Sequence, residues 1–148
     1  MQIGEVNGWL LLGDPLFESA LTELENEVSR LRDKDPVNYK NKNATKRLAA
    51  ITRLIGEVIP ADPSAREFRL GATLGPEFKH WRRAKFFQQY RLFFRYDSTT
   101  RIIIFSWIND AATKRAYESK NDAYAVFLKK LESGNPPTTW SELLESVS

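Results

Sequence analysis

The sequence predicts an α+β fold in which a twisted, mainly antiparallel sheet carries a helical hairpin on one face. Three observations support this prediction. The run from Trp81 to Asp110 contains three consecutive strand-like segments separated by polar turns. Two segments with helical apolar spacing precede it, and helix-capping patterns follow it. A chain of 148 residues is long enough for one proper core, so we expect a single domain spanning residues 1–148.

The first strand and the first helix are expected at the N-terminus. Residues Val6 to Leu12 are short and apolar and end at a glycine, which favours a strand inserted into the sheet. Asp14 and Pro15 follow as an N-cap and a first helical residue. From Phe17, apolar residues recur at spacings of four and three, so the first helix should reach about Arg32.

A second helix is expected from about Tyr39 to Glu57, after the break at Asp35-Pro36. The two helices should form an antiparallel hairpin that covers one apolar face of the sheet. The outward side of the second helix is basic. A solvated basic face is the plain interpretation, and an auxiliary phosphate-binding surface that includes Lys46 is the alternative.

The three central strands are bounded by recognisable turns. Residues Trp81 to Phe87 and Tyr90 to Tyr96 are expected to form strands on either side of a turn at Gln88-Gln89. The polar segment Asp97 to Thr100 then predicts a hairpin whose last strand ends near Trp107.

The segments between and after the strands are shorter. Residues Ala65 to Lys79 contain two glycines and a proline without a clean period, which indicates a loop or an irregular strand. Ala111 to Ser119 is expected to be a short helix, Asp122 to cap another, and Thr139 to open a final turn or two. We expect these short C-terminal helices to lie at one end of the sheet.

The strands carry an unusual number of cations. Between residues 66 and 101 there are nine Lys or Arg against three acidic residues, which makes this third of the chain +6 although the whole chain is +3. Arg83, Lys85, Arg91 and Arg95 lie inside strands at alternating positions, so they should share a face. A sheet face that is left open and positively charged is a candidate nucleic-acid surface.

Several functional classes lack the residues they need. The chain has no cysteine and one histidine, and it contains no H-x-x-x-H, no P-loop and no dinucleotide-binding glycine motif. We therefore expect no metal site, no cofactor and no catalytic triad. No apolar run approaches the roughly 20 residues of a membrane span, and the N-terminus does not resemble a signal peptide. The expected location is the cytoplasm, without a membrane partner.

The residues that are present suit cleavage of RNA. In that reaction the nucleophile is the 2′-hydroxyl of the substrate, so the enzyme needs a base, an acid and fixed positive charge on the phosphate. Arginines fit the last role, because the guanidinium stays charged and is fork-shaped. Lys85 is a candidate base, because neighbouring arginines disfavour its ammonium form. DNA lacks the 2′-hydroxyl and would not be cut by this route.

An ordered set of short segments also extends along nearly the whole chain. In chain order, these are Val6-Asn7-Gly8-Trp9; Lys34-Asp35-Pro36 with Asn38-Tyr39; Ala44-Thr45-Lys46 with Leu48-Ala49; Phe68-Arg69-x-Gly71-x-x-Leu74-Gly75; Trp81-x-Arg83-x-Lys85-Phe86; Tyr90-Arg91-Leu92-Phe93-Phe94-Arg95-Tyr96; Trp107-x-Asn109-Asp110; Asp122-Ala123-Tyr124-x-Val126-Phe127; and Pro136-Pro137-x-x-Trp140. Together they resemble the YhaV-type toxins of bacterial toxin–antitoxin systems, a branch of the RelE-like ribonucleases.

This resemblance implies a RelE-like fold and a function. The implied activity is that of an mRNA interferase, a metal-independent endoribonuclease that cleaves mRNA, free or on the ribosome, and so inhibits translation and growth. The implied partner is a small antitoxin of the PrlF type, and operator DNA would be bound only through the toxin–antitoxin complex.

The resemblance also implies roles for individual residues. Arg91 matches the strand arginine held against the scissile phosphate, and Arg83 and Lys85 match the two basic residues of the preceding strand. Tyr117, in the segment after the sheet, is the implied counterpart of the catalytic tyrosine. The basic residue that RelE-like enzymes carry six positions earlier would be Ala111 here, so the detailed mechanism is expected to differ.

Other residues are candidates for RNA contacts. Arg95, Arg115, Asn109 and Lys46 are the expected RNA-binding residues, with loop stabilisation as the alternative role for Asn109 and Arg115. The alternative function for the whole chain is a non-catalytic RNA- or ribosome-binding protein, or a DNA-binding regulator, that uses the same positive face only for phosphate contacts.

Overall fold

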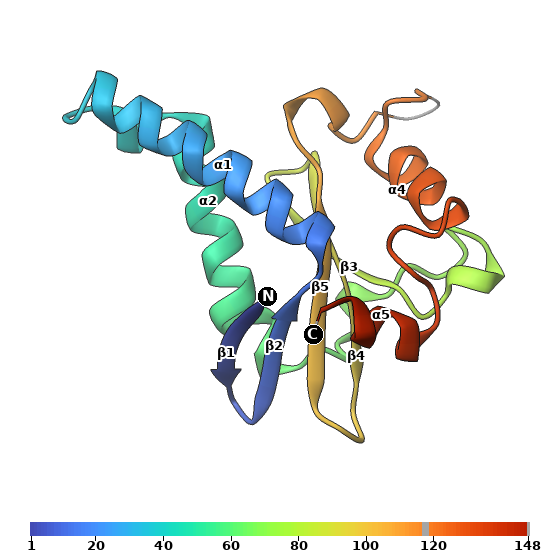
Figure 1. The fold of residues 1–148 in the computed structure, drawn as a ribbon. Coiled ribbons are helices and arrows are strands. Elements are labelled where there is room, and N and C mark those ends of the chain that lie inside the picture. Colours follow the sequence, from blue (N-terminus) through green and yellow to red (C-terminus); the bar gives the residue numbers. More distant parts are fainter. Residues whose placement is uncertain (117–118, 148) are drawn as a thin grey trace.

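The computed structural model describes residues 1–116 and 119–147, which form a five-stranded sheet with helices on both faces (Figure 1). The strands are β1 (Gln2–Val6), β2 (Trp9–Gly13), β3 (Arg82–Phe86), β4 (Tyr90–Asp97) and β5 (Ile102–Ile108). They lie in the order β1-β2-β5-β4-β3, and every pair is antiparallel except the parallel pair of β2 and β5. The predicted α+β, RelE-like class is confirmed.

The N-terminal strand differs from the prediction. The segment Val6 to Leu12 is not one strand, because Asn7 and Gly8 form a tight turn between β1 and β2 in which both have positive φ, 51° and 80°. Asn-Gly is the residue pair that such a two-residue hairpin turn prefers. The hairpin places β2 inside the sheet and leaves β1 at its edge.

The first helix matches the prediction and the second is more irregular. Helix α1 (Pro15–Lys34) begins where Asp14 caps it. After a 3-10 turn, α2 (Asn43–Arg53) continues through a π-helical segment (Leu54–Val58) into the short α3 (Ile59–Ala61). The α1–α2 hairpin covers one face of the sheet through a core that includes Phe17, Ile51, Ile59, Phe94 and Phe105.

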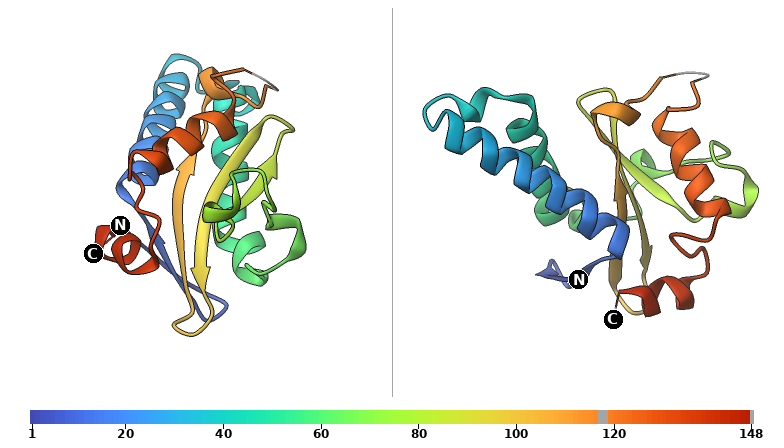
Figure 2. Two further views of the ribbon diagram at one scale, coloured as in Figure 1. Left: turned by 90° about the vertical axis from the view of Figure 1, so that its right-hand side faces the viewer. Right: turned by 45° about the horizontal axis from the view of Figure 1, so that its top comes forward.

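The second face of the sheet is also covered, which contradicts the expectation of an open face. Helices α4 (Ala123–Glu132) and α5 (Trp140–Ser146) lie over it rather than at its end (Figures 1 and 2). A second core lies there, and its largest fully buried members are Trp81, Phe93, Ile104 and Phe127. The positive residues of the strands therefore border a covered surface.

The predicted loop and the predicted short helix both differ in detail from the expectation. The segment from Ala65 to Lys79 contains two 3-10 turns, Arg66–Phe68 and Pro76–Phe78, and one bridge from Arg69 to Arg82. Directly after β5, Ala111–Thr113 form a 3-10 turn that Asp110 caps. This turn takes the place of the start of the helix that was expected from Ala111 to Ser119. No helix among the described residues has the length and hydropathy needed to span a bilayer.

The α1 cap contains a buried carboxyl group. Oδ1 of Asp14 accepts a hydrogen bond from the backbone nitrogen of Phe17 (2.9 Å), and the residue is 1% exposed. Burial raises the pKa of Asp14 from 3.8 to about 6, although hydrogen bonds from the backbone act in the opposite direction. The folded protein therefore binds a proton at Asp14 more tightly than the unfolded chain does.

We expect Asp14 to make the free energy of unfolding depend on pH. The stabilising contribution is complete below about pH 4 and is lost as the pH rises through about 6. Asp14→Asn keeps a capping oxygen that does not titrate, so its stability relative to wild type should rise by about 2 to 3 kcal/mol between pH 4 and pH 7. Urea unfolding of both proteins across this range measures the difference, and parallel pH profiles would contradict the assignment.

Candidate active site

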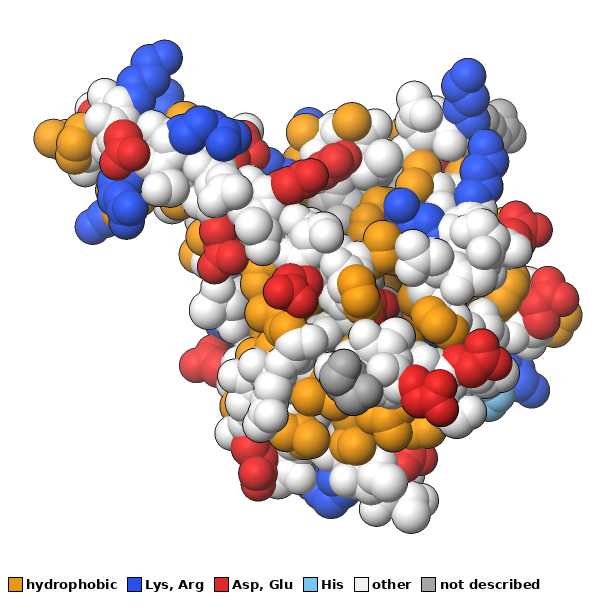
Figure 3. Space-filling view, in the orientation of Figure 1, with side chains coloured by type: hydrophobic (Ala, Val, Ile, Leu, Met, Phe, Trp, Pro, Cys, Tyr) orange, Lys and Arg blue, Asp and Glu red, His pale blue; other side chains and the backbone are white. Residues whose placement is uncertain are grey.

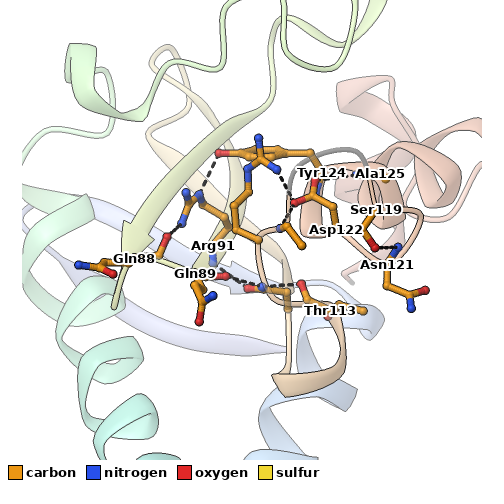
Figure 4. Close-up of polar contacts among 12 residues, drawn as sticks. Gln88, Gln89, Arg91, Thr113, Ser119, Asn121, Asp122, Tyr124 and Ala125 are labelled. Carbon is orange, nitrogen blue, oxygen red and sulfur yellow. Dashed lines mark hydrogen bonds and ion pairs between the residues drawn. The ribbon is translucent and has the colours of Figure 1, made fainter.

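Arg91 lies at the centre of a cluster of cations near one end of β4 (Figure 4). Its side chain is held in place by three hydrogen bonds: Nε donates to the hydroxyl of Tyr124 (2.9 Å), and Nη1 donates to the carbonyls of Gln88 (2.7 Å) and Tyr90 (2.9 Å). The residue is 7% exposed. The guanidinium is therefore fixed in direction before any ligand binds.

Arg83 on β3 approaches the same phenol. Its Nε donates to the Tyr124 hydroxyl (2.9 Å), and its Nη1 donates to the carbonyls of Glu67 (3.1 Å) and Arg69 (2.7 Å). A hydroxyl has two acceptor lone pairs and one donor hydrogen. Both recorded hydrogen bonds of the Tyr124 hydroxyl are accepted ones, so its own proton remains available for donation.

Lys85 lies directly opposite Arg91 in the β3–β4 register, with its side chain exposed. Cross-strand partners project from the same face of a sheet, so the ammonium group lies beside the arginine cluster. Among the described residues, no carboxylate forms an ion pair with Arg83, Lys85 or Arg91. Their positive charge is available for an anionic ligand.

Arg115 and Asp122 complete the surroundings of Tyr124. The guanidinium of Arg115 lies 4.7 Å from the centroid of the Tyr124 ring and forms an ion pair with Asp122. Burial opposes ionisation of Asp122, but hydrogen bonds from the backbone nitrogen of Ala116 and from Arg115 hold its pKa below the ordinary value. Asp122 also caps α4 through the backbone nitrogens of Tyr124 and Ala125, which links the helix to the cluster.

Asn109 holds the loops around Arg91 together. Its Oδ1 accepts from the backbone nitrogen of Arg91 (2.7 Å), and its Nδ2 donates to the carbonyls of Gln89 (3.0 Å) and Thr113 (2.9 Å). The residue is 3% exposed. These contacts favour the alternative that the sequence left open, in which Asn109 stabilises the loops instead of binding RNA.

The turn between β3 and β4 depends on these contacts. Phe87 and Gln88 have positive φ values of 45° and 60°, a conformation that residues other than glycine adopt at a cost of about 1 kcal/mol or more. Arg91 bonds the carbonyl of Gln88, and Asn109 and the backbone nitrogen of Arg115 bond that of Gln89. The site residues therefore offset the strain in the turn that carries them.

Two of the predicted RNA-binding residues lie outside the cluster. Arg95 is half-buried: its guanidinium lies 5.7 Å from the ring centroids of both Trp81 and Trp140, and it donates to the carbonyl of Thr138. Burial and the nearby Arg82 lower the pKa of Arg95. Lys46 is exposed on α2, which packs on the opposite face of the sheet.

Lys and Arg side chains also gather away from the cluster. In the view of Figure 3 they lie at the tip of the α1–α2 hairpin and above α4, with acidic side chains between them along α1. Tyr117, the remaining predicted site residue, lies outside the described residues.

Tyr124 is one of the phenols that the sequence places near the sheet, but it was not among the predicted catalytic or RNA-binding residues. Its side chain is buried on α4, and its hydroxyl meets the two arginines. The sequence contains an indication of this contact, because a buried phenol needs a hydrogen-bond partner and the strands carry arginines. The pairing itself depends on how α4 packs across the sheet.

The arrangement suits an anionic group with tetrahedral oxygens. Arg83 and Arg91 present guanidinium groups whose Nη2 atoms make no hydrogen bond within the described residues, and Lys85 adds an exposed ammonium. Charged donors of this kind bind phosphate strongly. Among the described residues, no group of three or more His, Cys, Asp or Glu side chains could hold a metal ion.

Comparisons with known proteins agree with a nuclease. A family model described as a toxin with endonuclease activity, of a toxin–antitoxin system, matches residues 11–148. The chain is 46% identical over 140 residues to the ribonuclease toxin YhaV of Escherichia coli K12, which covers 93% of this chain and 91% of that protein. It is also 46% identical over 144 residues to toxin YhaV of Escherichia coli O6:H1. That alignment covers 96% of this chain and 94% of the relative.

Removing the Asn109 amide should destabilise the protein. Asn109→Ala leaves the buried nitrogen of Arg91 and the carbonyl of Thr113 without their partner and removes one of the two donors to the carbonyl of Gln89, so we expect a loss of about 2 to 4 kcal/mol in the free energy of unfolding. Asn121→Ala is the matched control, because Asn121 is exposed. Equal urea midpoints for the two variants would show that the network contributes nothing.

Proposed function

Because this chain belongs to the YhaV family of toxins with endonuclease activity from toxin–antitoxin systems, we propose that it is an endoribonuclease that cleaves mRNA without a metal ion. The observation that carries this proposal is the convergence of Arg83 and Arg91 on one phenol, next to Lys85 and without a carboxylate partner among the described residues. The relative from Escherichia coli K12 is named a ribonuclease, which supports RNA as the substrate.

The guanidinium groups bind the scissile phosphate in this mechanism. Attack of the 2′-oxygen on phosphorus forms a pentacoordinate transition state with increased negative charge on its equatorial oxygens. Arg83 and Arg91 are already held by Tyr124 and by backbone carbonyls, so they need no reorganisation to stabilise that charge.

Two further side chains move the protons. Lys85, with its amine unprotonated, takes the proton from the 2′-hydroxyl and becomes an ammonium, the 2′-oxygen forms a bond to phosphorus, and the bond to the 5′-oxygen breaks. Tyr117 gives a proton to the leaving 5′-oxygen, so the products are a 2′,3′-cyclic phosphate and a 5′-hydroxyl. Tyr124 acts as a positioning residue for the two arginines.

The other predicted residues have supporting roles in this proposal. Arg115 stacks on Tyr124 and contributes positive charge beside the phosphate. Asn109 maintains the turn after β3. Arg95 and Lys46 would contact RNA only at phosphates more distant from the scissile one, because both lie outside the cluster.

The proposed partners follow from the same family assignment. RNA is the substrate, and a cognate antitoxin neutralises the toxin; an antitoxin of the PrlF type is the partner that the resemblance implies. Operator DNA is bound only through the toxin–antitoxin complex. Cleavage stops translation and growth in this proposal, whether the mRNA is free or on the ribosome.

Purified protein should cut single-stranded RNA in the presence of EDTA. We expect fragments that end in a 2′,3′-cyclic phosphate, and no cleavage where a single 2′-deoxy nucleotide replaces the one before the cut. Arg91→Gln should lower kcat/KM at least about 100-fold, since it removes a charged donor to the transition state. Arg53→Ala is the matched control, because Arg53 is exposed and pairs only with Glu57 among the described residues.

The outcomes of this assay separate the alternatives. Cleavage that requires a divalent ion, or cleavage after a 2′-deoxy nucleotide, contradicts the proposed chemistry. Tight, salt-sensitive RNA binding by wild type without cleavage supports the non-catalytic function. Circular dichroism of Arg91→Gln shows whether the loss of activity occurs in a folded protein.

The two tyrosines should give different kinetic signatures. Tyr117→Phe is expected to lower kcat about 100-fold with little change in RNA affinity, because it removes a proton donor. Tyr124→Phe should weaken RNA binding as well as kcat, because Arg83 and Arg91 lose their common acceptor. Single-turnover kinetics and RNA titrations measure both, and the reverse pattern would exchange the two roles.

A further inference from the structure

A groove lies along the edge of the sheet beside the arginine cluster. It has a volume of about 420 Å³ and is bounded by β3 residues 83–85, by residues 66–69 and by Leu54 and Val58 of the π-helical segment. β3 is the last strand of the sheet, so the groove lies at the sheet edge, next to the bridge between Arg69 and Arg82. Volumes of this size are typical of sites for small molecules or single nucleotides.

The charge of the groove is strongly positive. Arg66, Arg69, Arg83 and Lys85 line it, against one acidic residue, Glu67. Arg66, Arg69 and Lys85 are exposed, and among the described residues none of the four cations forms an ion pair. An anion that enters the groove therefore meets cations whose charge is not already neutralised.

The groove is continuous with the candidate active site through Arg83. One side of this guanidinium bonds to Tyr124 in the cluster, and Nη1 bonds to the carbonyls of Glu67 and Arg69 in the groove wall. Lys85 also belongs to both, since it lines the groove and lies opposite Arg91. A polyanion whose reacting phosphate lies at Arg91 therefore meets Arg83 and Lys85 where it enters the groove.

We propose that this groove binds the nucleotide next to the scissile linkage of a single-stranded RNA. Arg66 and Arg69 contact its flanking phosphates, and its base packs against the apolar wall formed by Leu54 and Val58. The mixture of cations and apolar side chains matches a nucleotide, because phosphates are bound by charge and unpaired bases by apolar or aromatic contact. This assignment rests on the proposed ribonuclease function, and it names which part of the substrate the enzyme holds.

The test removes the two groove arginines that do not belong to the cluster. In an Arg91→Gln background, in which cleavage is expected to be at least about 100-fold slower, the double variant Arg66→Ala/Arg69→Ala should bind a fluorescent RNA oligonucleotide about 10-fold more weakly near 0.1 M salt. The slope of log affinity against log salt should fall by about 0.7 for each phosphate that the variant can no longer bind. With Arg91 intact, the same double variant should raise KM and leave kcat unchanged, because the groove binds substrate and transition state equally.

RNA length gives an independent measurement. Oligonucleotides are lengthened one nucleotide at a time from the cleavage site and titrated against the Arg91→Gln protein with Arg66 and Arg69 intact. Affinity should increase at the step that adds the adjacent nucleotide. The double variant should not gain at that step. Arg30→Ala/Lys34→Ala is the matched control, because it removes the same charge from exposed positions on α1.

Each result bears on the groove separately from the ribonuclease function. If wild type cuts RNA and the groove variant binds and cuts as wild type does, the groove assignment is overturned and the function stands. If the control loses as much affinity as the groove variant, net charge explains the binding and the assignment is again overturned. If wild type does not cut RNA but the groove variant alone loses affinity, the function fails and the binding site stands.

Discussion

The hydrogen bonds from two arginines to the Tyr124 hydroxyl connect the parts of this protein that matter for its chemistry. Arg83 comes from β3, Arg91 from β4 and Tyr124 from α4, so one oxygen atom joins two strands and a helix. Two guanidinium groups this close repel each other, and burial raises the cost. The phenol oxygen and the carbonyls of Glu67, Arg69, Gln88 and Tyr90 offset that cost by accepting hydrogen bonds.

The position of Tyr124 is in turn set by aromatic packing. Phe127, one turn further along α4, stacks on Phe93 with ring centroids 4.1 Å apart, and Trp107 lies parallel to Phe127 at 5.9 Å. An irregularity in β5 allows this, because the register passes from Trp107 to Phe105 and leaves Ser106 without a partner. Trp107 therefore faces the same core as Ile104, beneath the helix that carries the phenol.

The covered second face changes how the site works. Instead of an open positive sheet, the protein presents a short row of cations where the C-terminal core ends, from Arg91 through Lys85 to the groove at β3. The buried members are rigid and directional, and the exposed members are free to follow a ligand. Such a division suits an enzyme that must fix one phosphate and tolerate variation in the rest of the strand.

The sequence by itself determined the local features. The α1 cap at Asp14 and the alternation that puts Arg83, Lys85 and Arg91 on one face depend on neighbours in the chain, so spacing was enough to predict them. The Asn7-Gly8 turn was equally local and was overlooked in favour of a longer strand. Only the tertiary structure decided that α4 and α5 cover the second face, that Asn109 stabilises the loops by hydrogen bonds, and that Tyr124 bonds two arginines. The last two facts depend on hydrogen bonds between residues 18 to 41 positions apart, and the periodicity of one segment does not specify how far it lies from another.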